Sequence, residues 1–569
     1  MATAFCMPKN GMDMTEGTLV RWLKEEGDHV EKDEPIVEIE TDKVTMEAES
    51  PVSGILLKKL YADGDVVPVL TEIAYIGEAN ETVPEAGKAA APAASAAAAP
   101  AQEEKGGKED FTVAVIGGGP AGYVAAIRAA QLGAKVALFE KDTLGGTCLN
   151  RGCIPTKSFL KTAEHLHHIK QFAERGIQFE GTVSVDMPTI VKQKNSAVTT
   201  LTNGVGALLR SNHVTVIKGV ATLASANSIA CEGNVYTAKK IILCGGSQSA
   251  MIPIPGIDHP AVVSSTELLD AEEVPARLCI IGGGVIGCEL ATAFRAFGSD
   301  VTVVEKMDTL VPVMDTDITK LLKQTMEKDG IKIYLGEGVV AIEGKPDGSA
   351  VLKTEKQEIP CDKILVAVGR KPDLECLGAM ADQIKVERGR IIVDDTMKTS
   401  VDNIYACGDV NGRLMLAHAA FHMGEVAAEN CVTGKNAPCK LNCVPNVLYT
   451  LPEAAGVGLT EAEAKKQYQA RVKVGKFPFA ANGRALVSGC PEGFVKVVVD
   501  AQYGEILGVH MIGGAASEMI AEAAALMKTE ITVDEVVSEI VHAHPSYSEA
   551  FYEACADALG RCIHLPAKS

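Results

Sequence analysis

The chain has 569 residues, 47% of them hydrophobic, which is enough for several packed domains. Its formal charge of −20 and isoelectric point near 5.2 argue against nucleic acid and anionic membrane surfaces as partners, because no basic stripe can neutralise phosphates. The longest apolar stretch, residues 113–127, is interrupted by four glycines and a proline, so no membrane span is expected. Sixteen cysteines without framework spacing, and no signal peptide, predict a cytoplasmic protein. We expect protein and small-molecule partners and no metal site.

Residues 1–79 contain an internal repeat of a turn and a strand. Gly-Asp turns occur at Gly27 and Gly64. The first turn is followed by the β-rich stretch 36–39 and the second by the stretch 69–76. Two related half-sheets predict an all-β domain, a small flattened β-barrel or sandwich.

Lys43 lies between the two halves, where alternating apolar residues on both sides place a hairpin turn. An exposed lysine at a rigid tip suits enzymatic attachment of a cofactor. The region resembles lipoyl domains, since Gly54 follows Lys43 by eleven residues and residues 7–12 are similar to the first strand of such domains. A biotin carrier would have methionine on both sides of the lysine, whereas Asp42 and Val44 match the lipoyl pattern. The resemblance implies covalent lipoate on Lys43.

Residues 80–108 are predicted to be a flexible linker. Of the sixteen residues 86–101, eleven are Ala and two are Pro, and this composition cannot bury a core. Coil statistics give a segment of this length a root-mean-square span of roughly 30 Å and a stretched limit of about 95 Å. The linker would let the N-terminal domain visit more than one active site.

Residues 111–140 fit a strand-helix-strand unit that binds a dinucleotide. The apolar strand 111–116 leads into a glycine fingerprint, then a helix over 123–132 and a strand over 135–140. In such units the second glycine lets a pyrophosphate approach the helix N-terminus, the third lets helix and strand pack, and the final acidic residue binds a ribose hydroxyl. The three fingerprint glycines are Gly117, Gly119 and Gly122, and the acidic residue is Glu140.

The same unit recurs over residues 277–305, so the chain should bind two dinucleotides. Its strands span 277–281 and 300–305, with a helix over 288–297 between them. Glu305 indicates NAD rather than NADP, because a carboxylate binds the ribose 2′-hydroxyl but repels a 2′-phosphate. Its fingerprint residues are Gly282, Gly284 and Gly287.

Two cysteines, Cys148 and Cys153, lie in the segment 145–157 just after the first fingerprint. A dithiol that opens a helix beside a bound dinucleotide can pass two electrons between a ring cofactor and an outside sulfur compound, since helix N-termini favour thiolates. The alternative is a pair of small buried packing residues. The neighbouring glycines, a proline and Lys157 favour redox chemistry.

These motifs resemble the pyridine nucleotide-disulphide oxidoreductases, most closely the dihydrolipoyl dehydrogenase branch, over about residues 111–566. The resemblance implies FAD on the first unit and a nicotinamide nucleotide on the second. It implies two Rossmann-like α/β domains and a C-terminal α+β dimerisation domain after the lipoyl domain. The expected segments are 1–79 (lipoyl), 80–108 (linker), 109–258 (first FAD-binding part), 259–385 (NAD-binding), 386–445 (FAD-binding and central) and 446–569 (dimerisation).

The resemblance also implies roles for residues outside the fingerprints. Lys157 and Glu289 would pair near the reactive flavin nitrogen. Asp409 would hold the ribityl chain, Ala417 would begin a helix beside the flavin, and Gly369 would belong to the nicotinamide site.

By the same resemblance His544 is the catalytic acid-base and Glu549 orients it. An imidazole tuned by a carboxylate supplies a base near pH 7, as the oxidation of a dithiol requires. Three points stay open. His542 is an alternative base, His418 is favoured as a core histidine over a flavin neighbour, and Gly245 stands where the family usually has Thr, which puts a local FAD contact in doubt.

The implied reaction oxidises protein-bound dihydrolipoamide through Cys148, Cys153 and FAD and reduces NAD⁺ to NADH. The implied partners are a second copy of the chain, sharing the active site as a homodimer, and the decarboxylase and acyltransferase components of a 2-oxo acid or acetoin dehydrogenase complex. Mercuric or glutathione reductase and a non-catalytic lipoyl carrier are the alternatives. Mercuric reductase would have a vicinal cysteine pair near the C-terminus, whereas Cys555 and Cys562 lie seven apart and are interpreted as helix packing.

Overall fold

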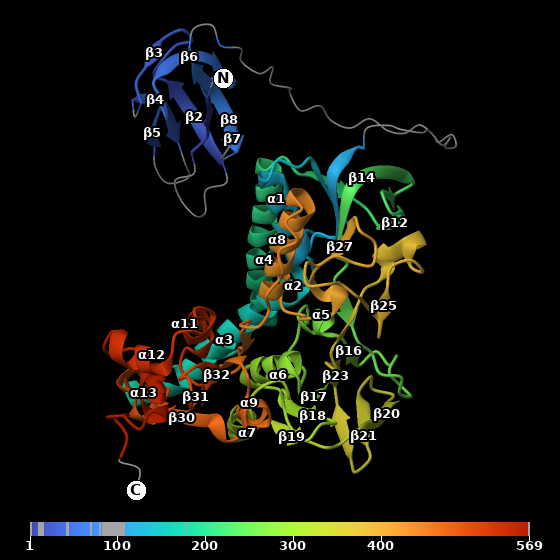
Figure 1. The fold of residues 1–569 in the computed structure, drawn as a ribbon, viewed down its shortest axis with the longest axis vertical. Helices are drawn as coiled ribbons and strands as arrows, with labels where there is room; N and C mark the ends of the chain where they lie inside the picture. The colour runs from blue at the N-terminus through green and yellow to red at the C-terminus, as the bar shows by residue number, and fades with distance from the viewer. Residues whose placement is uncertain are drawn as a thin grey trace. The chain divides into compact units, whose positions relative to one another are not determined.

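The computed structural model describes residues 3–8, 16–32, 34–40, 45–68, 71–78, 81, 109–178 and 180–566 (Figure 1). The chain divides into two compact units, Met1–Lys105 and Gly106–Ser569. Lys43 lies outside the described residues, as does the predicted linker apart from Glu81.

The N-terminal unit contains two four-stranded sheets, in the orders β1-β8-β6-β3 and β5-β4-β2-β7, with every pair antiparallel. Both sheets contribute buried side chains to one core, Leu19 and Ile36 from one sheet and Leu56 and Ile73 from the other. The predicted β-sandwich is therefore confirmed. Its strands are β1 (Thr3–Cys6), β2 (Glu16–Trp22), β3 (His29–Val30), β4 (Pro35–Glu40), β5 (Thr45–Glu49), β6 (Gly54–Lys59), β7 (Val66–Pro68) and β8 (Glu72–Gly77).

The two Gly-Asp turns of the repeat have the same structure. The Asp28 carboxylate and the Asp65 carboxylate each accept a hydrogen bond of 2.8 Å from the backbone N–H three residues earlier. Gly27 and Gly64 adopt φ of +99° and +89°, a region in which a side chain would be strained. The repeat in the sequence is thus a structural repeat, and it relates the two sheets.

In the larger unit, the first Rossmann-like domain is built on a parallel sheet in the order β11-β10-β9-β14-β27, and β12 and β13 extend β14 with antiparallel pairing. Because β27 comes from far along the chain, the segment after the second nucleotide unit returns to complete this sheet. The strands are β9 (Phe111–Ile116), β10 (Val136–Glu140), β11 (Thr215–Lys218), β12 (Ala221–Ser225), β13 (Ser228–Cys231), β14 (Asn234–Leu243) and β27 (Ile404–Ala406).

The helices of this domain lie along the sheet, and α1, α4 and α8 run side by side in Figure 1. The first helix begins at Pro120, three residues before the expected start, because the proline suits the first helical turn. The helices are α1 (Pro120–Gln131), α2 (Gly146–Arg151), α3 (Cys153–Gln171), α4 (Met187–Ser211) and α8 (Ala417–Thr433), with 3₁₀ turns η1 (Ala173–Arg175), η2 (Glu375–Met380) and η3 (Gly408–Asn411).

The second Rossmann-like domain has a five-stranded parallel sheet in the order β16-β23-β17-β18-β19. A three-stranded antiparallel sheet, β20-β21-β22, and the small sheets β15-β24 and β25-β26 accompany it. The strands are β15 (Ser247–Ser249), β16 (Val262–Val263), β17 (Arg277–Ile281), β18 (Asp300–Val304), β19 (Lys332–Tyr334), β20 (Val339–Gly344), β21 (Ala350–Thr354), β22 (Glu358–Cys361), β23 (Lys363–Val366), β24 (Arg370–Pro372), β25 (Val386–Glu387) and β26 (Arg390–Ile391), and the helices are α5 (Ser265–Leu268), α6 (Val285–Phe297) and α7 (Thr316–Lys328).

The C-terminal domain is an antiparallel sheet in the order β28-β29-β32-β31-β30 with helices, so the predicted α+β class is confirmed. The final helix begins at Glu549. None of the helices in the described part of the chain is long and apolar enough to cross a membrane. The elements are β28 (Asn446–Leu448), β29 (Ala454–Gly458), β30 (Val472–Pro478), β31 (Phe494–Asp500), β32 (Ile506–Ile512), α9 (Glu461–Tyr468), η4 (Gln469–Arg471), η5 (Phe479–Ala481), α10 (Gly483–Ser488), α11 (Ala516–Lys528), α12 (Val533–Glu539) and α13 (Glu549–Ala558).

Candidate active site

The two cysteines of the predicted dithiol lie in the first turns of two consecutive helices. Cys148 is the third residue of α2, and Cys153 is the first residue of α3. Gly152 separates the helices with φ −138° and ψ −106°, and a Cβ there would lie 2.9 Å from the carbonyl oxygen of Thr147. The backbone thus bends tightly at Gly152, and the dithiol spans two helices. Each thiol nevertheless lies near a helix N-terminus, where a thiolate is favoured.

The electrostatic environment distinguishes the two thiols. The hydrogen bond from the Cys148 thiol lowers the pKa of Cys153 to about 7, against the opposing effect of burial, and the Lys157 ammonium lowers it further. The same hydrogen bond, together with burial, raises the pKa of Cys148 well above its ordinary value. These opposite shifts favour the thiolate at Cys153 and the protonated thiol at Cys148 in the reduced pair.

Lys157 and Glu289 form an ion pair that joins α3 to α6. The Lys157 Nζ lies 2.9 Å from both carboxylate oxygens of Glu289, whose side chain is only 3% exposed. The backbone N–H of Tyr449 donates to Glu289 Oε1 at 3.0 Å, and the Tyr449 ring centroid lies 4.3 Å from the Lys157 Nζ. The sequence does not single out Tyr449, because its only signal is an aromatic residue just after a short strand. Three domains thus meet beside Cys153.

The first glycine fingerprint shapes an open helix N-terminus. Gly119 is the N-cap of α1, which has no side-chain cap, so its first N–H groups can receive a phosphate. A Cβ at Gly122 would lie 1.7 Å from the carbonyl oxygen of Gly117, so only glycine lets the helix pack on the strand. The carboxylate of Glu140 accepts a hydrogen bond of 2.6 Å from Gly118 N–H. This arrangement fits the ADP part of FAD.

The second fingerprint repeats that geometry at the start of α6. Gly284 is the N-cap, again without a side-chain cap, and a Cβ there would meet nothing within 4 Å. Gly287 packs against Gly282 as its counterpart does in the first unit. The two carboxylate oxygens of Glu305 accept from Gly283 N–H at 2.6 Å and Met307 N–H at 2.7 Å. The residues therefore fit a second dinucleotide.

Gly369 lies in the turn after β23, beside this second fingerprint. It adopts φ +116°, and a Cβ there would meet nothing within 4 Å. The neighbouring carbonyl oxygen of Ala367 would lie 2.4 Å from a Cβ at Gly282. The turn is thus close to the glycine loop and open to a ligand.

Asp409 belongs to a polar network that the sequence only partly indicated. The Ser247 hydroxyl donates to Asp409 Oδ2 at 2.5 Å, and Arg370 Nε donates to that hydroxyl at 2.7 Å. The Arg370 guanidinium also reaches Thr147 Oγ1, at 3.5 Å, in the helix that contains Cys148. Burial lowers the pKa of Arg370. Neither Ser247 nor Arg370 carries a local motif that would have revealed this contact.

The structure explains why residue 245 is glycine where the family usually has Thr. A Cβ on Gly245 would lie 2.8 Å from the backbone oxygen of Asp373 and 3.1 Å from the Cys376 sulfur. A threonine would require the backbone to shift. Ser247, two residues later, supplies a hydroxyl to Asp409 instead.

The helix that begins with Ala417 packs closely on α1. A Cβ on Gly424 would lie 2.5 Å from the carbonyl oxygen of Ala121, so α1 and α8 come near backbone contact. His418 is exposed, and its Nε2 lies 2.9 Å from the carbonyl oxygen of Pro445. The expectation of a core histidine is therefore wrong, because this position faces away from the helix packing.

The two histidines of the C-terminal motif have different environments. His544 is 79% exposed, and its Nδ1 lies 2.8 Å from Glu549 Oε1, which leaves Nε2 free. Glu549 is itself oriented by Ser546 N–H at 2.8 Å. His542 is 8% exposed and pairs with Glu522 at 2.6 Å. Only His544 can reach a substrate. Among the described residues of one chain, its bond is to Glu549, and none joins it to the dithiol.

Cys555 and Cys562 also differ from each other. Cys555 is buried within α13, whereas Cys562 lies beyond the end of that helix and donates to Glu553 at 2.9 Å. Cys562 is therefore not part of the helix, but it packs against the core to which the helix belongs. The described residues contain no group of three or more His, Cys, Asp or Glu side chains arranged to hold a metal ion.

Three family models match the chain. Residues 111–424 match the pyridine nucleotide-disulphide oxidoreductase model. Residues 444–555 match the dimerisation domain of the same family. Residues 3–76 match a model described as biotin-requiring enzyme.

Individual proteins are similar over the same region. A dihydrolipoyl dehydrogenase of Bacillus subtilis is 40% identical, covering 80% of this chain and 100% of that protein. One of Thermus scotoductus is 43% identical, covering 80% of this chain and 99% of that protein. The HOCl-induced flavoprotein disulfide reductase RclA from Escherichia coli is a structural match with TM-score 0.71 and 29% identity, covering 78% of this chain and 99% of that one.

Proposed function

Because the chain belongs to the pyridine nucleotide-disulphide oxidoreductase family, we infer that it is a dihydrolipoyl dehydrogenase, which oxidises dihydrolipoamide to lipoamide and reduces NAD⁺ to NADH. The observation that carries the inference is the arrangement of the Cys148–Cys153 dithiol. It lies beside the Lys157–Glu289 pair, where the two nucleotide-binding domains meet. FAD and NAD are its cofactors.

The residues of the two fingerprints would hold these cofactors, with Glu140 on the FAD ribose and Glu305 on the NAD ribose. Asp409, with Ser247 and Arg370 around it, would bind the central part of FAD. When bound, FAD accepts two electrons from the dithiol and passes them to the nicotinamide.

The directions of the two thiol pKa shifts support the following order of the sulfur chemistry. One substrate thiolate attacks Cys148 of the Cys148–Cys153 disulphide, and Cys153 leaves as the thiolate, because the sulfur with the lower pKa is the better leaving group. The second substrate thiolate then attacks the sulfur of the first, which closes the lipoamide ring and releases Cys148. Cys148, with its raised pKa, takes up a proton. His544 Nε2 would remove the proton from the attacking thiol, with Glu549 holding Nδ1.

We propose that the active form is a homodimer and that each dithiol is served by His544 of the partner subunit. The match to the dimerisation domain supports this, as does the 79% exposure of the His544 side chain. Exposed imidazole on the surface of a pairing domain is available to a second copy.

We also propose that Lys43 carries lipoate and that residues 80–108 tether this arm. The match over residues 3–76 supports the lipoyl domain, and β4 pairs with β5 on either side of the lysine, with Glu40 opposite Thr45. The arm would connect the enzyme to the decarboxylase and acyltransferase of a 2-oxo acid or acetoin dehydrogenase complex, in the cytoplasm.

The function is tested with the purified full-length protein. A yellow protein that forms NADH from NAD⁺ and dihydrolipoamide is expected, and the activity should disappear in Cys148→Ser while FAD stays bound. A protein that instead reduces glutathione disulphide or mercuric ion with NADPH, and that does not oxidise dihydrolipoamide, would contradict the assignment. Proteins that co-purify with the enzyme would identify the complex.

A further inference from the structure

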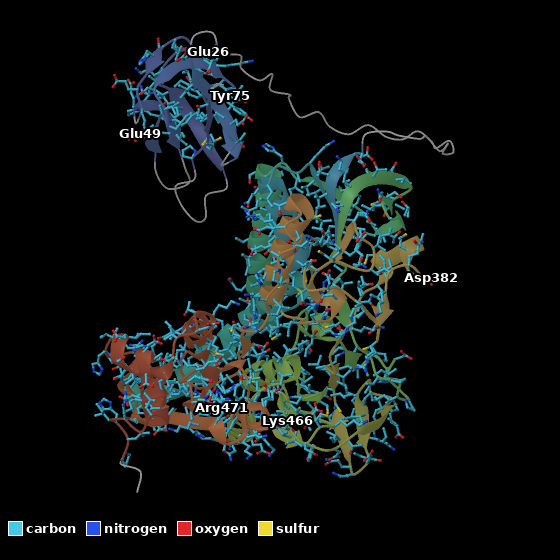
Figure 2. The ribbon with its side chains drawn as sticks, viewed as in Figure 1. Glu26, Glu49, Tyr75, Asp382, Lys466 and Arg471 are labelled. Carbon is cyan, nitrogen blue, oxygen red and sulfur yellow. The ribbon has the colours of Figure 1, made fainter. Side chains whose placement is uncertain are left out.

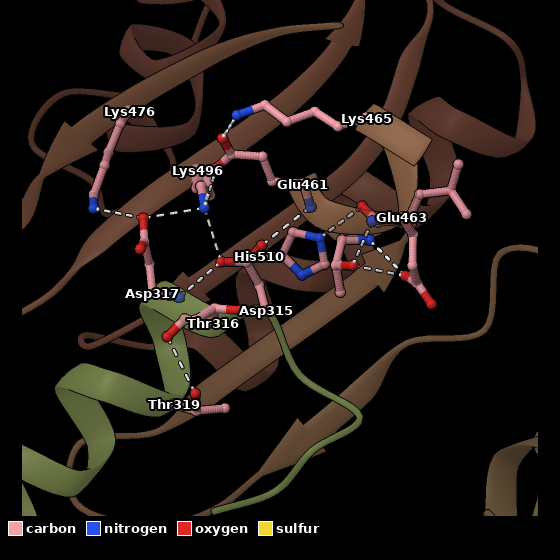
Figure 3. A network of polar contacts seen from close by, with 12 residues as sticks. Asp315, Thr316, Asp317, Thr319, Glu461, Glu463, Lys465, Lys476, Lys496 and His510 are labelled. Atoms are coloured by element: carbon pink, nitrogen blue, oxygen red, sulfur yellow. Dashed lines mark hydrogen bonds and ion pairs between the residues drawn. The ribbon is translucent and has the colours of Figure 1, made fainter. Parts of the chain in front are cut away.

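A buried lysine joins the dimerisation domain to the nicotinamide-binding domain (Figure 3). Lys496, on β31, is 3% exposed. Its Nζ contacts three carboxylates, at 2.8 Å from Asp315 Oδ1, 3.0 Å from Asp317 Oδ2 and 2.6 Å from Glu461 Oε2. Burial alone would lower the pKa of Lys496, but the bonds to Asp315 and Glu461 outweigh it and raise that pKa. The lysine is therefore charged, and losing a partner would leave a buried charge poorly compensated.

The outer carboxylates have lysine partners of their own. Lys476 Nζ lies 3.1 Å from Asp317 Oδ2, and Lys465 Nζ lies 2.6 Å from Glu461 Oε1. With Lys496 and Asp315, the cluster contains three ammonium and three carboxylate groups. Its charges balance, so the cluster does not point to a bound ion but to a role in holding the two domains together.

Asp315 is hydrogen-bonded both by its own nicotinamide-binding domain and by the dimerisation domain. Its Oδ1 also accepts from Asp317 N–H at 3.0 Å and so caps α7. Its Oδ2 accepts from the backbone N–H of Glu461 at 3.1 Å, at the start of α9. The side chain is 2% exposed. The position of Asp315 is therefore set by the dimerisation domain as much as by its own domain.

The backbone just before Asp315 is strained. Val311 has φ +40° although it is β-branched, precedes Pro312 and is 1% exposed. Both the branching and the following proline disfavour this conformation. Such strain persists only where the surrounding structure enforces it, and it gathers at functional sites.

This strained turn contacts the glycine loop of the second fingerprint. Val311 N–H donates to the carbonyl oxygen of Gly283 at 2.9 Å, and a Cβ on Gly283 would lie 2.5 Å from the Leu310 side chain. Gly283 N–H in turn donates to Glu305. The segment 305–315 thus starts at the ribose-binding carboxylate, crosses the glycine loop and ends at the buried Lys496–Asp315 pair.

We propose that Lys496 and Asp315 are positioning residues for the nicotinamide nucleotide. The buried Lys496–Asp315 pair holds the segment 305–315 against the strain at Val311, and this keeps the glycine loop and Glu305 in the geometry that binds NAD. The dimerisation domain thereby sets the affinity for NAD. The proposal rests on the proposed function, since it concerns the nucleotide that this function uses.

Asp315→Asn is the first test, because the amide oxygen can still accept the Asp317 N–H bond that caps α7. The variant side chain carries no charge, and its NH₂ group cannot accept from Glu461 N–H. In the FAD-loaded protein the dissociation constant for NAD⁺, measured by calorimetry, should rise about five- to tenfold, within the usual range of coupling between sites. FAD content and the rate at which dihydrolipoamide reduces the enzyme without NAD⁺ should stay unchanged.

The matched control is Asp300→Asn, the same charge change in an exposed pair with Lys332 on the same domain, at 2.8 Å. Its effect on NAD⁺ binding should be under about twofold, as expected for a surface pair. If Asp315→Asn does not fold, Asp317→Asn, whose side chain is 37% exposed, should raise the dissociation constant in the same direction by less.

A second pair of variants tests the effect of the backbone strain at Val311 on NAD⁺ binding. In the Asp315→Asn background, Val311→Gly and Val311→Ala both remove the valine packing, but only glycine adopts φ +40° without strain. The glycine double variant should bind NAD⁺ at least about threefold more tightly than the alanine double variant.

The outcomes are distinct. Unchanged NAD⁺ binding in folded Asp315→Asn, an equal loss in Asp300→Asn, or equal affinities of the glycine and alanine double variants would each overturn the proposal. A wild-type protein that binds no NAD⁺ would overturn the proposed function, and this proposal with it.

Discussion

Lys157 Nζ and the carboxylate of Glu289 are 2.9 Å apart at both oxygens, and they link the helix that begins with Cys153 to the helix that follows the second glycine fingerprint. The ammonium group lowers the pKa of Cys153 and the carboxylate raises it. The Lys157–Glu289 pair therefore does more than join two domains, because it also shifts the pKa of the neighbouring Cys153 thiol. Figure 2 shows how densely side chains fill the unit in which these helices lie.

The first prediction concerns the pKa of Cys153. In the reduced protein, Cys153 should react with iodoacetamide as a thiolate above a midpoint near pH 7 and lose that reactivity as the pH falls through it. Lys157→Met removes the positive charge and should move the midpoint upward, whereas Glu289→Gln removes the negative charge and should move it downward. Peptide mass spectrometry of Cys153 against pH measures both shifts. Shifts in the same direction for the two variants would contradict the assignment.

The second prediction concerns the base. The His544→Ala variant should fold and keep FAD. Its rate of dihydrolipoamide oxidation should fall by a factor of about 10²–10⁴, the usual rate contribution of general-base catalysis. His542→Ala removes the buried neighbour and should change stability more than the chemical step. Steady-state kinetics and thermal unfolding of both variants provide the comparison.

The third prediction tests the shared site. Mixing inactive His544→Ala chains with inactive Cys148→Ser chains should restore activity, because half of the sites in each heterodimer would pair an intact base with an intact dithiol. Heterodimers that form without activity, or a wild-type monomer with full activity, would show that the site lies within one chain.

The fourth prediction concerns cofactor choice. NAD should be preferred over NADP by at least about tenfold in kcat/KM, equivalent to roughly 1.4 kcal/mol, because both oxygens of Glu305 are held by backbone N–H groups at the ribose position. Comparable activity with the two nucleotides would refute the role given to Glu305.

The fifth prediction concerns Gly245. Gly245→Thr should destabilise the protein by about 1–3 kcal/mol, the usual cost of overpacking, because its Cβ would press on the backbone oxygen of Asp373. Gly204→Thr is the matched control, since a Cβ at that exposed position in α4 meets nothing within 4 Å. The thermal unfolding temperature and the FAD content should fall for Gly245→Thr only. Equal stability of the two would show that the space at residue 245 is not limiting.

Patterns that span a few residues could be predicted from the sequence. The glycine fingerprints, with Gly122 against the carbonyl of Gly117, depend on backbone geometry within one strand-helix turn, and the Gly27 and Gly64 turns depend on one glycine and one aspartate each. Such features follow from local sterics and hydrogen bonding, which neighbouring residues determine by themselves.

Contacts between distant segments were decided only by the tertiary structure. The contacts of Tyr449 with Glu289 and of Lys496 with Asp315 join residues from different domains. The contact of Arg370 with Ser247 joins two strands that lie far apart in the sequence, and none of these contacts belongs to a local motif. His542 and His544 are two residues apart in the sequence, yet one is buried against Glu522 and the other is exposed. Burial and partner choice depend on how whole elements pack, so the sequence alone determined the dinucleotide-binding units and the dithiol, and the packing of the domains determined which side chains surround them.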